Sequence, residues 1–100
     1  MSEMEIVEVD ADLEDLIPLF LETRQKDIAG LASGLAAGNF NALRLIGHSM
    51  KGAGGGYGFD RVSEIGALIE DAALAGDGAS IKAQMETLRD YLQRVQIKYV

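Results

Sequence analysis

Apolar residues recur at spacings of three and four along most of this 100-residue chain. Such spacing places them on one face of an α-helix. The pattern predicts four long amphipathic helices, at about 18–37, 39–57, 59–76 and 79–98, after a short helix at about 11–17. Residues 1–10 are expected to be an extended or irregular lead-in. Long amphipathic helices joined by short turns favour an all-α fold, an antiparallel up-down four-helix bundle with a short extra N-terminal helix.

Turn-forming and capping residues separate the predicted helices. Gly38 followed by Asn39 is typical of a helix end and a new N-cap. Gly58 is expected to end the next helix, and Asp60 is the candidate cap of the helix after it. The run Gly-Asp-Gly at 76–78 has the composition of a turn. Because the sequence contains no linker or repeat, we expect a single domain over the whole chain, 1–100.

The segment 39–57 contains the only histidine, His48, and sorts into two faces when it is drawn as a helix. Its apolar face carries Leu43, Ile46, Met50, Ala53, Gly54 and Tyr57. The opposite face carries His48 with Arg44, Lys51, Gly52 and Gly55. An interior glycine costs a helix about 1 kcal/mol relative to alanine, and a solvent-facing position offers no packing reason for that cost. We therefore interpret Gly52 and Gly55 as a docking floor that lets a partner approach an exposed imidazole.

Composition excludes several functions. The chain has no cysteine, which excludes disulfides and thiolate chemistry, and its single histidine disfavours a zinc site. A net charge of −7 is unfavourable for nucleic-acid binding. No apolar run reaches the length of a membrane span, and the acidic N-terminus lacks the layout of a signal peptide. We expect a cytoplasmic protein that binds neither nucleic acid nor membrane, and no metal.

The glycine-rich run does not match a nucleotide-binding motif. Gly47 and Gly52 have the spacing of the Walker pattern, but Ala53 and Gly54 follow where Lys and Ser or Thr are required. The pattern GxGxxG fails as well, and no strand precedes the run. Gly47 and Gly54 lie nearer the apolar face, where glycine allows helices to pack closely. We therefore expect no ATP site in this chain.

Segment 48–59, HSMKGAGGGYGF, resembles the signature of the histidine-containing phosphotransfer (HPt) domain family. That signature is His, two residues, Lys, Gly, small residues, then an apolar residue, Gly and an apolar residue, and the segment matches at each position. The flanking helices suit the family's four-helix bundle. The resemblance implies a phosphocarrier that relays a phosphoryl group between the aspartates of receiver domains through a phosphohistidine. It also implies that the chain is not itself a kinase.

The resemblance implies roles for individual residues. His48 is expected to be the nucleophile and phosphoryl carrier, with Nε2 as the phosphorylated atom. Lys51, one helical turn later on the same face, can offset phosphoryl charge. Arg44, one turn earlier, is a further candidate that lies outside the family motif. Glu70 matches a position where family members carry Gln or Glu, which can bond the other imidazole nitrogen. The alternative for each of these side chains is an ordinary solvated surface residue.

Partners follow from the same resemblance. A response-regulator receiver domain would supply the aspartate and the Mg²⁺, a (hybrid) sensor histidine kinase would act with it, and the chain itself would hold no cofactor. We favour a monomer. Two other functions are possible: an adaptor or inhibitor that binds a kinase or receiver without turnover, and a structural bundle, which leaves the exposed glycines unexplained. A metal-dependent hydrolase fits least, since the acidic residues lack the inward ExxH pairing of such bundles.

Overall fold

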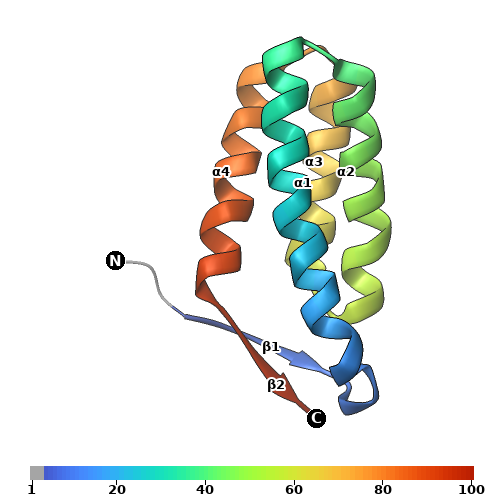
Figure 1. Ribbon diagram of the computed structural model, residues 1–100, viewed down its shortest axis with the longest axis vertical. Helices are drawn as coiled ribbons and strands as arrows, with labels where there is room; N and C mark the ends of the chain where they lie inside the picture. The colour runs from blue at the N-terminus through green and yellow to red at the C-terminus, as the bar shows by residue number, and fades with distance from the viewer. Residues whose placement is uncertain (1–3) are drawn as a thin grey trace.

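Four antiparallel helices form the body of the protein in the computed structural model, which describes residues 4–100 (Figure 1). They run up, down, up and down as α1 (Ile17–Ala37), α2 (Phe40–Gly54), α3 (Asp60–Leu74) and α4 (Gly78–Arg94). A 3₁₀ helix, η1 (Ala11–Leu16), precedes α1, and a second one, η2 (Gly55–Tyr57), follows α2. The predicted helical bundle with a short extra N-terminal helix is therefore confirmed. Within the described part of the chain, no helix is long and apolar enough to cross a membrane.

Two short strands add a feature that the all-α prediction lacks. β1 (Glu5–Val9) and β2 (Val95–Tyr99) pair in parallel across one end of the bundle (Figure 1). The register joins residue 5 to residue 95 and residue 9 to residue 99. The expectation of an extended or irregular lead-in over 1–10 is thus met by a strand from residue 5, while residues 1–3 lie outside the described part. The predicted helix over 79–98 is wrong at its C-terminal end, because α4 stops at residue 94.

The C-terminal segment fits two periodicities, and the pairing with β1 decides between them. Leu92, Val95 and Tyr99 have helical spacing, which predicts a continuing helix. Val95 and Tyr99 also belong to an alternating pattern with Ile97, in which Val95 and Ile97 are half-buried while Gln96 is exposed. β-branched side chains suit a pleated, half-buried surface. Because β1 supplies a partner strand and the end of the bundle supplies an apolar surface, the strand is the conformation adopted.

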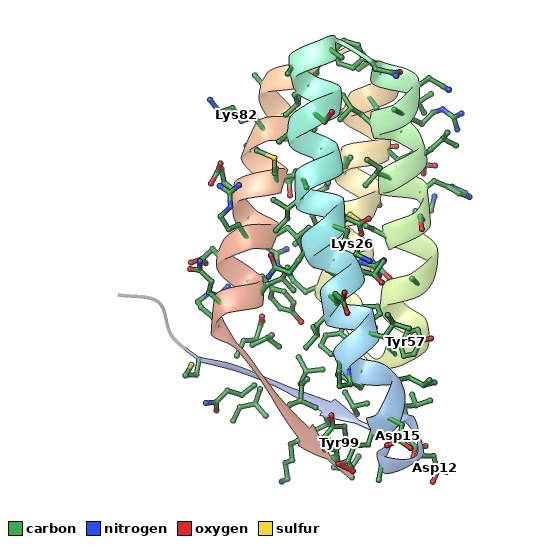
Figure 2. The ribbon with its side chains drawn as sticks, viewed as in Figure 1. Asp12, Asp15, Lys26, Tyr57, Lys82 and Tyr99 are labelled. Carbon is green, nitrogen blue, oxygen red and sulfur yellow. The ribbon has the colours of Figure 1, made fainter. Side chains whose placement is uncertain are left out.

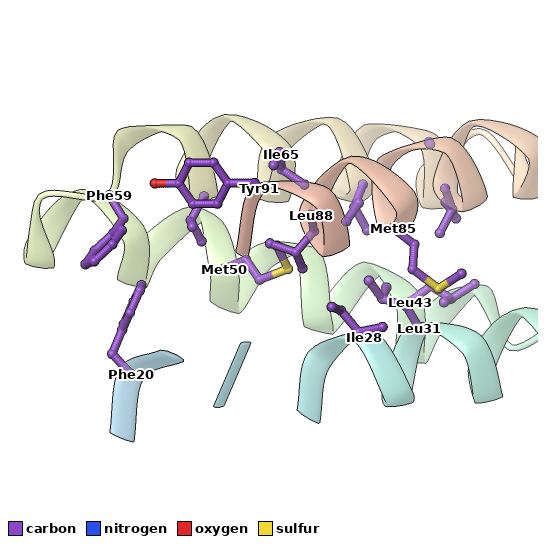
Figure 3. Close-up of a cluster of buried hydrophobic side chains, with 14 of the residues drawn as sticks. Phe20, Ile28, Leu31, Leu43, Met50, Phe59, Ile65, Met85, Leu88 and Tyr91 are labelled. Atoms are coloured by element: carbon purple, nitrogen blue, oxygen red, sulfur yellow. The ribbon is translucent and has the colours of Figure 1, made fainter. Parts of the chain in front are cut away.

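Apolar side chains from all four helices meet in one core (Figure 3). Towards the strand end, Phe20 of α1 stacks on Phe59 with ring centroids 4.8 Å apart and contacts Tyr57 at 4.9 Å. Along the bundle, the core continues through side chains that are almost completely buried: Leu31, Leu43, Met50, Ile65, Ile69, Ile81, Leu88 and Tyr91. The predicted apolar faces of α2, α3 and α4 therefore do point inward.

Arg24 is buried, although the sequence pattern places it among polar residues. Residues 24–27 read as a polar band, yet Arg24 is only 3% exposed. Its Nε donates to Asp27 Oδ2 at 2.7 Å, and its guanidinium lies 4.7 Å from the centre of the Phe20 ring. Burial raises the pKa of Asp27, although the neighbouring guanidinium opposes the rise. An ion pair and an aromatic face allow this arginine to be buried.

The predicted helix ends at Gly38 and Gly58 and the predicted N-cap at Asn39 are observed, whereas the predicted cap at Asp60 is not. Gly38 adopts the left-handed conformation with φ of 64°, and the Asn39 side chain accepts from the Ala42 amide at 3.1 Å. At the start of α3, however, Phe59 occupies the N-cap without a side-chain hydrogen bond, and Asp60 is the first helical residue. The Phe59 ring is wholly buried, so core packing rather than capping sets this helix start.

α2 and α3 approach each other more closely than side chains would allow. A Cβ atom at Gly47 would lie 2.7 Å from the Glu70 nitrogen and 2.8 Å from the Gly66 oxygen. A Cβ atom at Gly66 would lie 2.5 Å from the Lys51 nitrogen. At Gly54 the corresponding atom would lie 2.7 Å from the Phe59 oxygen. The predicted role of Gly47 and Gly54 in close helix packing is therefore confirmed, and Gly66 completes the contact from α3.

Alanine substitutions at two glycines of α2 should have opposite effects on stability. Gly47→Ala is expected to lower the free energy of unfolding by about 1–3 kcal/mol, because the new methyl group overlaps backbone atoms of α3. A Cβ atom at Gly52 would meet no atom within 4 Å. Gly52→Ala should therefore raise the free energy of unfolding by up to about 1 kcal/mol. Urea unfolding followed by circular dichroism measures both, and equal effects at the two positions would contradict the close approach.

Candidate functional site

His48 stands on the outer face of α2 with its ring held by α3. Its side chain is 66% exposed, in agreement with its position opposite the apolar face. Nδ1 lies 2.7 Å from Oε2 of Glu70, a residue 22 positions away in the sequence. The Glu70 side chain is only 14% exposed, so it reaches the imidazole from between the two helices. The close contact of α2 and α3 therefore brings one carboxylate to one nitrogen of the exposed imidazole.

Lys51 shares the same carboxylate. Its Nζ donates to Oε1 of Glu70 at 2.9 Å, while Oε2 of Glu70 faces His48. The two oxygens of one carboxylate thus hold a cation and an imidazole that lie one turn apart on α2. Half of the Lys51 side chain is exposed, so the ammonium lies at the surface beside the ring. This links Lys51, Glu70 and His48 as a connected group.

The contacts of Glu70 with Lys51 and His48 favour the charged forms of Glu70 and Lys51. The hydrogen bond from Lys51, and after it the hydrogen bond from His48, lowers the pKa of Glu70. The hydrogen bond to Glu70 and its negative charge raise the pKa of Lys51. Both groups are therefore charged at neutral pH, the first as a carboxylate and the second as an ammonium.

The ionised state of Glu70 determines which nitrogen of His48 carries a hydrogen. A carboxylate accepts hydrogen bonds and donates none, so the contact at 2.7 Å requires a hydrogen on Nδ1 of His48. In the neutral ring Nε2 then holds the free lone pair. An imidazole whose one nitrogen is fixed by a carboxylate has its other nitrogen oriented, as in hydrolase triads and metal-bound histidines. The arrangement suits a nucleophile at Nε2.

Arg44 is the predicted site residue that the structure leaves apart. Its Nη2 donates to Oδ1 of Asn41 at 3.0 Å, one turn towards the start of α2 and away from His48. Helical side chains lean towards the N-terminus, which favours this direction. Within residues 4–100 no hydrogen bond or ion pair joins Arg44 to His48 or to Glu70.

Gly52 and Gly55 both lie on the exposed side of α2, as predicted, but their surroundings differ. A Cβ atom would meet nothing within 4 Å at Gly52, and the same holds for Gly56. At Gly55 it would meet Ser63 Oγ at 3.6 Å, an ordinary contact. Gly52, Gly55 and Gly56 are therefore exposed on the side of His48, while Gly54 between them is buried against α3.

Ser63 is a residue of this region that the sequence pattern does not single out. Its hydroxyl accepts from the Gly55 amide at 2.8 Å and donates to the Lys51 carbonyl at 2.9 Å. A half-buried serine in the first turns of a helix is an ordinary residue in sequence terms. The signal that points to it is spacing: Ser63 precedes Gly66 by three positions and Glu70 by seven, so all three share one face of α3.

An open, mostly apolar groove lies next to this surface, between the start of α1 and the end of α2. Its volume is about 200 Å³. Ala53, which lines the groove, is the residue after Gly52 in the sequence. Leu16 and Leu19 at its edge are both exposed. Tyr57, at the end of η2, lies beside the start of α1 (Figure 2). The full lining consists of Leu16, Leu19, Phe20, Thr23, Arg24, Ala53 and Tyr57.

Acidic side chains do not gather into a metal centre in the described residues. Among residues 4–100, no group of three or more His, Cys, Asp or Glu side chains is arranged to hold a metal ion. Glu70 is occupied by Lys51 and His48, as described above.

Comparison with known proteins gives one match. The family model described as the Hpt domain matches residues 15–98, which covers α1 to α4 and most of β2. Neither a curated protein nor a solved structure matches the chain.

The titration of Glu70 tests the shared carboxylate. Its pKa is expected below the ordinary value of 4.5, and Lys51→Met should raise it because the ammonium is the largest cause of the shift. Since the pKa is lower in the folded protein, these contacts stabilise the fold fully above pH 4.5 and are lost as the pH falls through the lowered value. Carbon-13 NMR of the Glu70 carboxyl measures the midpoint. Lys82→Met on α4 is the control, because Lys82 lies on the far helix (Figure 2); equal midpoints in both variants would contradict the contact.

Proposed function

Because this chain belongs to the Hpt domain family, whose members are histidine phosphocarriers of phosphorelays, we propose that His48 accepts a phosphoryl group from one receiver-domain aspartate and donates it to another. The observation that carries the proposal is the contact of 2.7 Å between His48 Nδ1 and Glu70, which leaves Nε2 as the nucleophilic nitrogen of an exposed ring. A histidine with no partner would lack this orientation.

The proposed transfer is a displacement at phosphorus. The Nε2 lone pair attacks the phosphorus of an aspartyl phosphate, the N–P bond forms, and the P–O bond to aspartate breaks to release its carboxylate. The hydrogen on Nδ1 stays in place, so the phosphorylated ring carries a positive charge that Glu70 faces. Transfer onward reverses the step. The receiver domain would supply the aspartate and Mg²⁺, and this chain contributes orientation and charge.

Lys51 supports the proposal through charge. The protein carries a net charge of −7, which opposes the approach of a phosphoryl group. The Lys51 ammonium lies one turn from His48 and remains protonated because Glu70 raises its pKa. It neutralises Glu70 and keeps a positive charge within one helical turn of the imidazole, which can offset the negative charge of the phosphoryl oxygens. Arg44 would add a second cation only if its side chain turned from Asn41 towards the ring, so its participation stays a prediction.

The docking surface for the receiver domain follows from the bare backbone and the groove. Gly52 and Gly55 leave room for a partner to reach Nε2, and the groove beside Ala53 offers apolar surface next to that floor. Exposed leucines at positions 16 and 19 fit an interface better than a free surface. A hybrid sensor histidine kinase would present its receiver domain to the same surface.

Chemical phosphorylation tests the carrier role. The purified protein is incubated with a small phosphoramidate donor and examined by mass spectrometry, and an acid-labile phosphate is expected on His48. Acid lability distinguishes phosphohistidine from phosphoserine at the adjacent Ser49. The label should be absent in His48→Gln and should leave the wild-type protein when a receiver domain with Mg²⁺ is added. A folded wild-type protein that takes no label would favour the adaptor function instead.

Gly52→Gln tests the docking floor separately from the chemistry. The new side chain is expected to obstruct the partner, so phosphoryl transfer to a receiver domain should slow by about tenfold or more, since small misplacements of reacting atoms are costly. Labelling by the small donor should remain within about twofold of wild type, because that donor needs no docking. Ala83→Gln, on the exposed side of α4, is the control. Transfer at the wild-type rate in Gly52→Gln would refute the docking role.

A further inference from the structure

The hydroxyl of Ser63 bridges two backbone groups on the neighbouring helix. It accepts a hydrogen bond from the Gly55 amide at 2.8 Å and donates one to the Lys51 carbonyl at 2.9 Å. Lys51 and Gly55 are four residues apart, so these are the groups that pair with each other to close an α-helical turn. A side chain from α3 therefore spans the last turn of α2, at the point where the chain passes into the 3₁₀ helix η2.

This use of a helical serine is unusual because the local alternative is available. A serine in a helix commonly donates to the carbonyl four residues earlier, which for Ser63 is that of Phe59. The Ser63 amide does bond to the Phe59 oxygen, at 3.4 Å, but the hydroxyl is directed to α2 instead. The hydroxyl thus both accepts and donates its hydrogen bonds across the helix interface rather than within α3.

Glycine makes the bridge sterically possible. A Cβ atom at Gly54 would lie 2.6 Å from the Ser63 nitrogen and 2.7 Å from its Oγ. Any larger residue at position 54 would push Ser63 away from Lys51 and Gly55. The glycine at 54 therefore brings the hydroxyl within reach, as the pair of Gly47 and Gly66 does for the carboxylate of Glu70.

The bridge and the carboxylate together hold Lys51 at both ends. Ser63 holds its carbonyl at 2.9 Å, and Glu70 holds its ammonium at 2.9 Å. Ser63 and Glu70 are seven residues apart, or two helical turns, with Gly66 between them on the same face of α3. One face of α3 thus contacts the imidazole of His48, both ends of Lys51 and the amide of Gly55.

We propose that Ser63 is a positioning residue for phosphoryl transfer, which sets the last turn of α2 so that Lys51 and the glycine floor face the partner at His48. The inference rests on the proposed phosphocarrier function and adds a residue that acts only through α2. Without the hydroxyl, the Lys51–Glu70 ion pair is the side-chain hydrogen bond that still joins the turn at 51–55 to α3 in the described residues, and Gly54 and the Lys51 backbone still pack against that helix. The receiver domain then meets a floor that moves relative to His48.

Ser63→Ala tests the inference with two readouts on the full chain. Hydrogen exchange at the Gly55 amide is expected to be about tenfold faster, because one hydrogen bond is lost there, while exchange at the core residue Ile69 stays unchanged. Transfer from labelled His48 to a receiver domain with Mg²⁺ should slow by about tenfold, and labelling by a small phosphoramidate should stay within about twofold. Ser33→Ala, an exposed helical serine on α1, is the matched control and should change neither value.

The outcomes separate this inference from the function on which it rests. Faster exchange at Gly55 with an unchanged rate of transfer would mean that Ser63 stabilises the turn locally without affecting the reaction, which would overturn the positioning role. A wild-type protein that takes no label from the phosphoramidate would instead refute the carrier function. If Ser63→Ala unfolds, the isosteric pair Ser63→Thr and Ser63→Val replaces it. Threonine keeps the hydroxyl and should transfer at close to the wild-type rate, whereas equal rates for the two variants would overturn the proposal.

Discussion

The contact between α2 and α3 is the constraint on which the rest of the site depends. Two glycines, Gly47 and Gly66, bring backbone against backbone, at distances that no side chain could occupy. At the usual helix separation of about 8–10 Å, side chains of both helices fill the space between them. Here Glu70, already mostly covered by the two helices, contacts both His48 and Lys51. Close packing thus provides the carboxylate, and the carboxylate determines which nitrogen of His48 is free.

Glycine has two opposite uses within one short stretch of α2. On the inner side it removes side chains so that another helix can approach, and the cost in helix propensity is offset by packing. On the outer side, at Gly52 and Gly56, no neighbour within the described chain benefits. The inner glycines fit a structural requirement, whereas the outer ones fit a partner that comes from outside. A single glycine-rich motif therefore combines the internal helix contacts with the surface that we propose for docking a partner.

Periodicity predicts the bundle and the placement of His48, because α2 has a wide apolar face and a polar face that differ clearly. Glu70 was reached through the family resemblance, since a glutamate on a helix edge has no distinctive pattern of its own. The end of α4 was not predictable from periodicity: Val95 and Tyr99 fit helix and strand alike, and a segment ninety residues earlier decides between them. The burial of Arg24 and the bridging hydrogen bonds of Ser63 could not be predicted either. An ion pair or a bridge between helices is set by packing rather than by residue type. The roles of Lys51, Arg44 and Gly55 in transfer stay predictions.

The parallel pairing of β1 with β2 has a consequence for the order in which the chain folds. Residue 5 pairs with residue 95, so the sheet closes a loop that contains nearly the whole chain, whereas His48 and Glu70 are only 22 residues apart. Loop-closure entropy grows with the length of the loop, and contacts between near neighbours form sooner. We therefore expect the hairpin of α2 and α3, with the contacts of His48, Lys51 and Glu70, to form first, and the sheet to join the two ends of the chain afterwards. The residues proposed for phosphoryl transfer all belong to one helical hairpin, and the terminal strands would complete a structure that already holds them together.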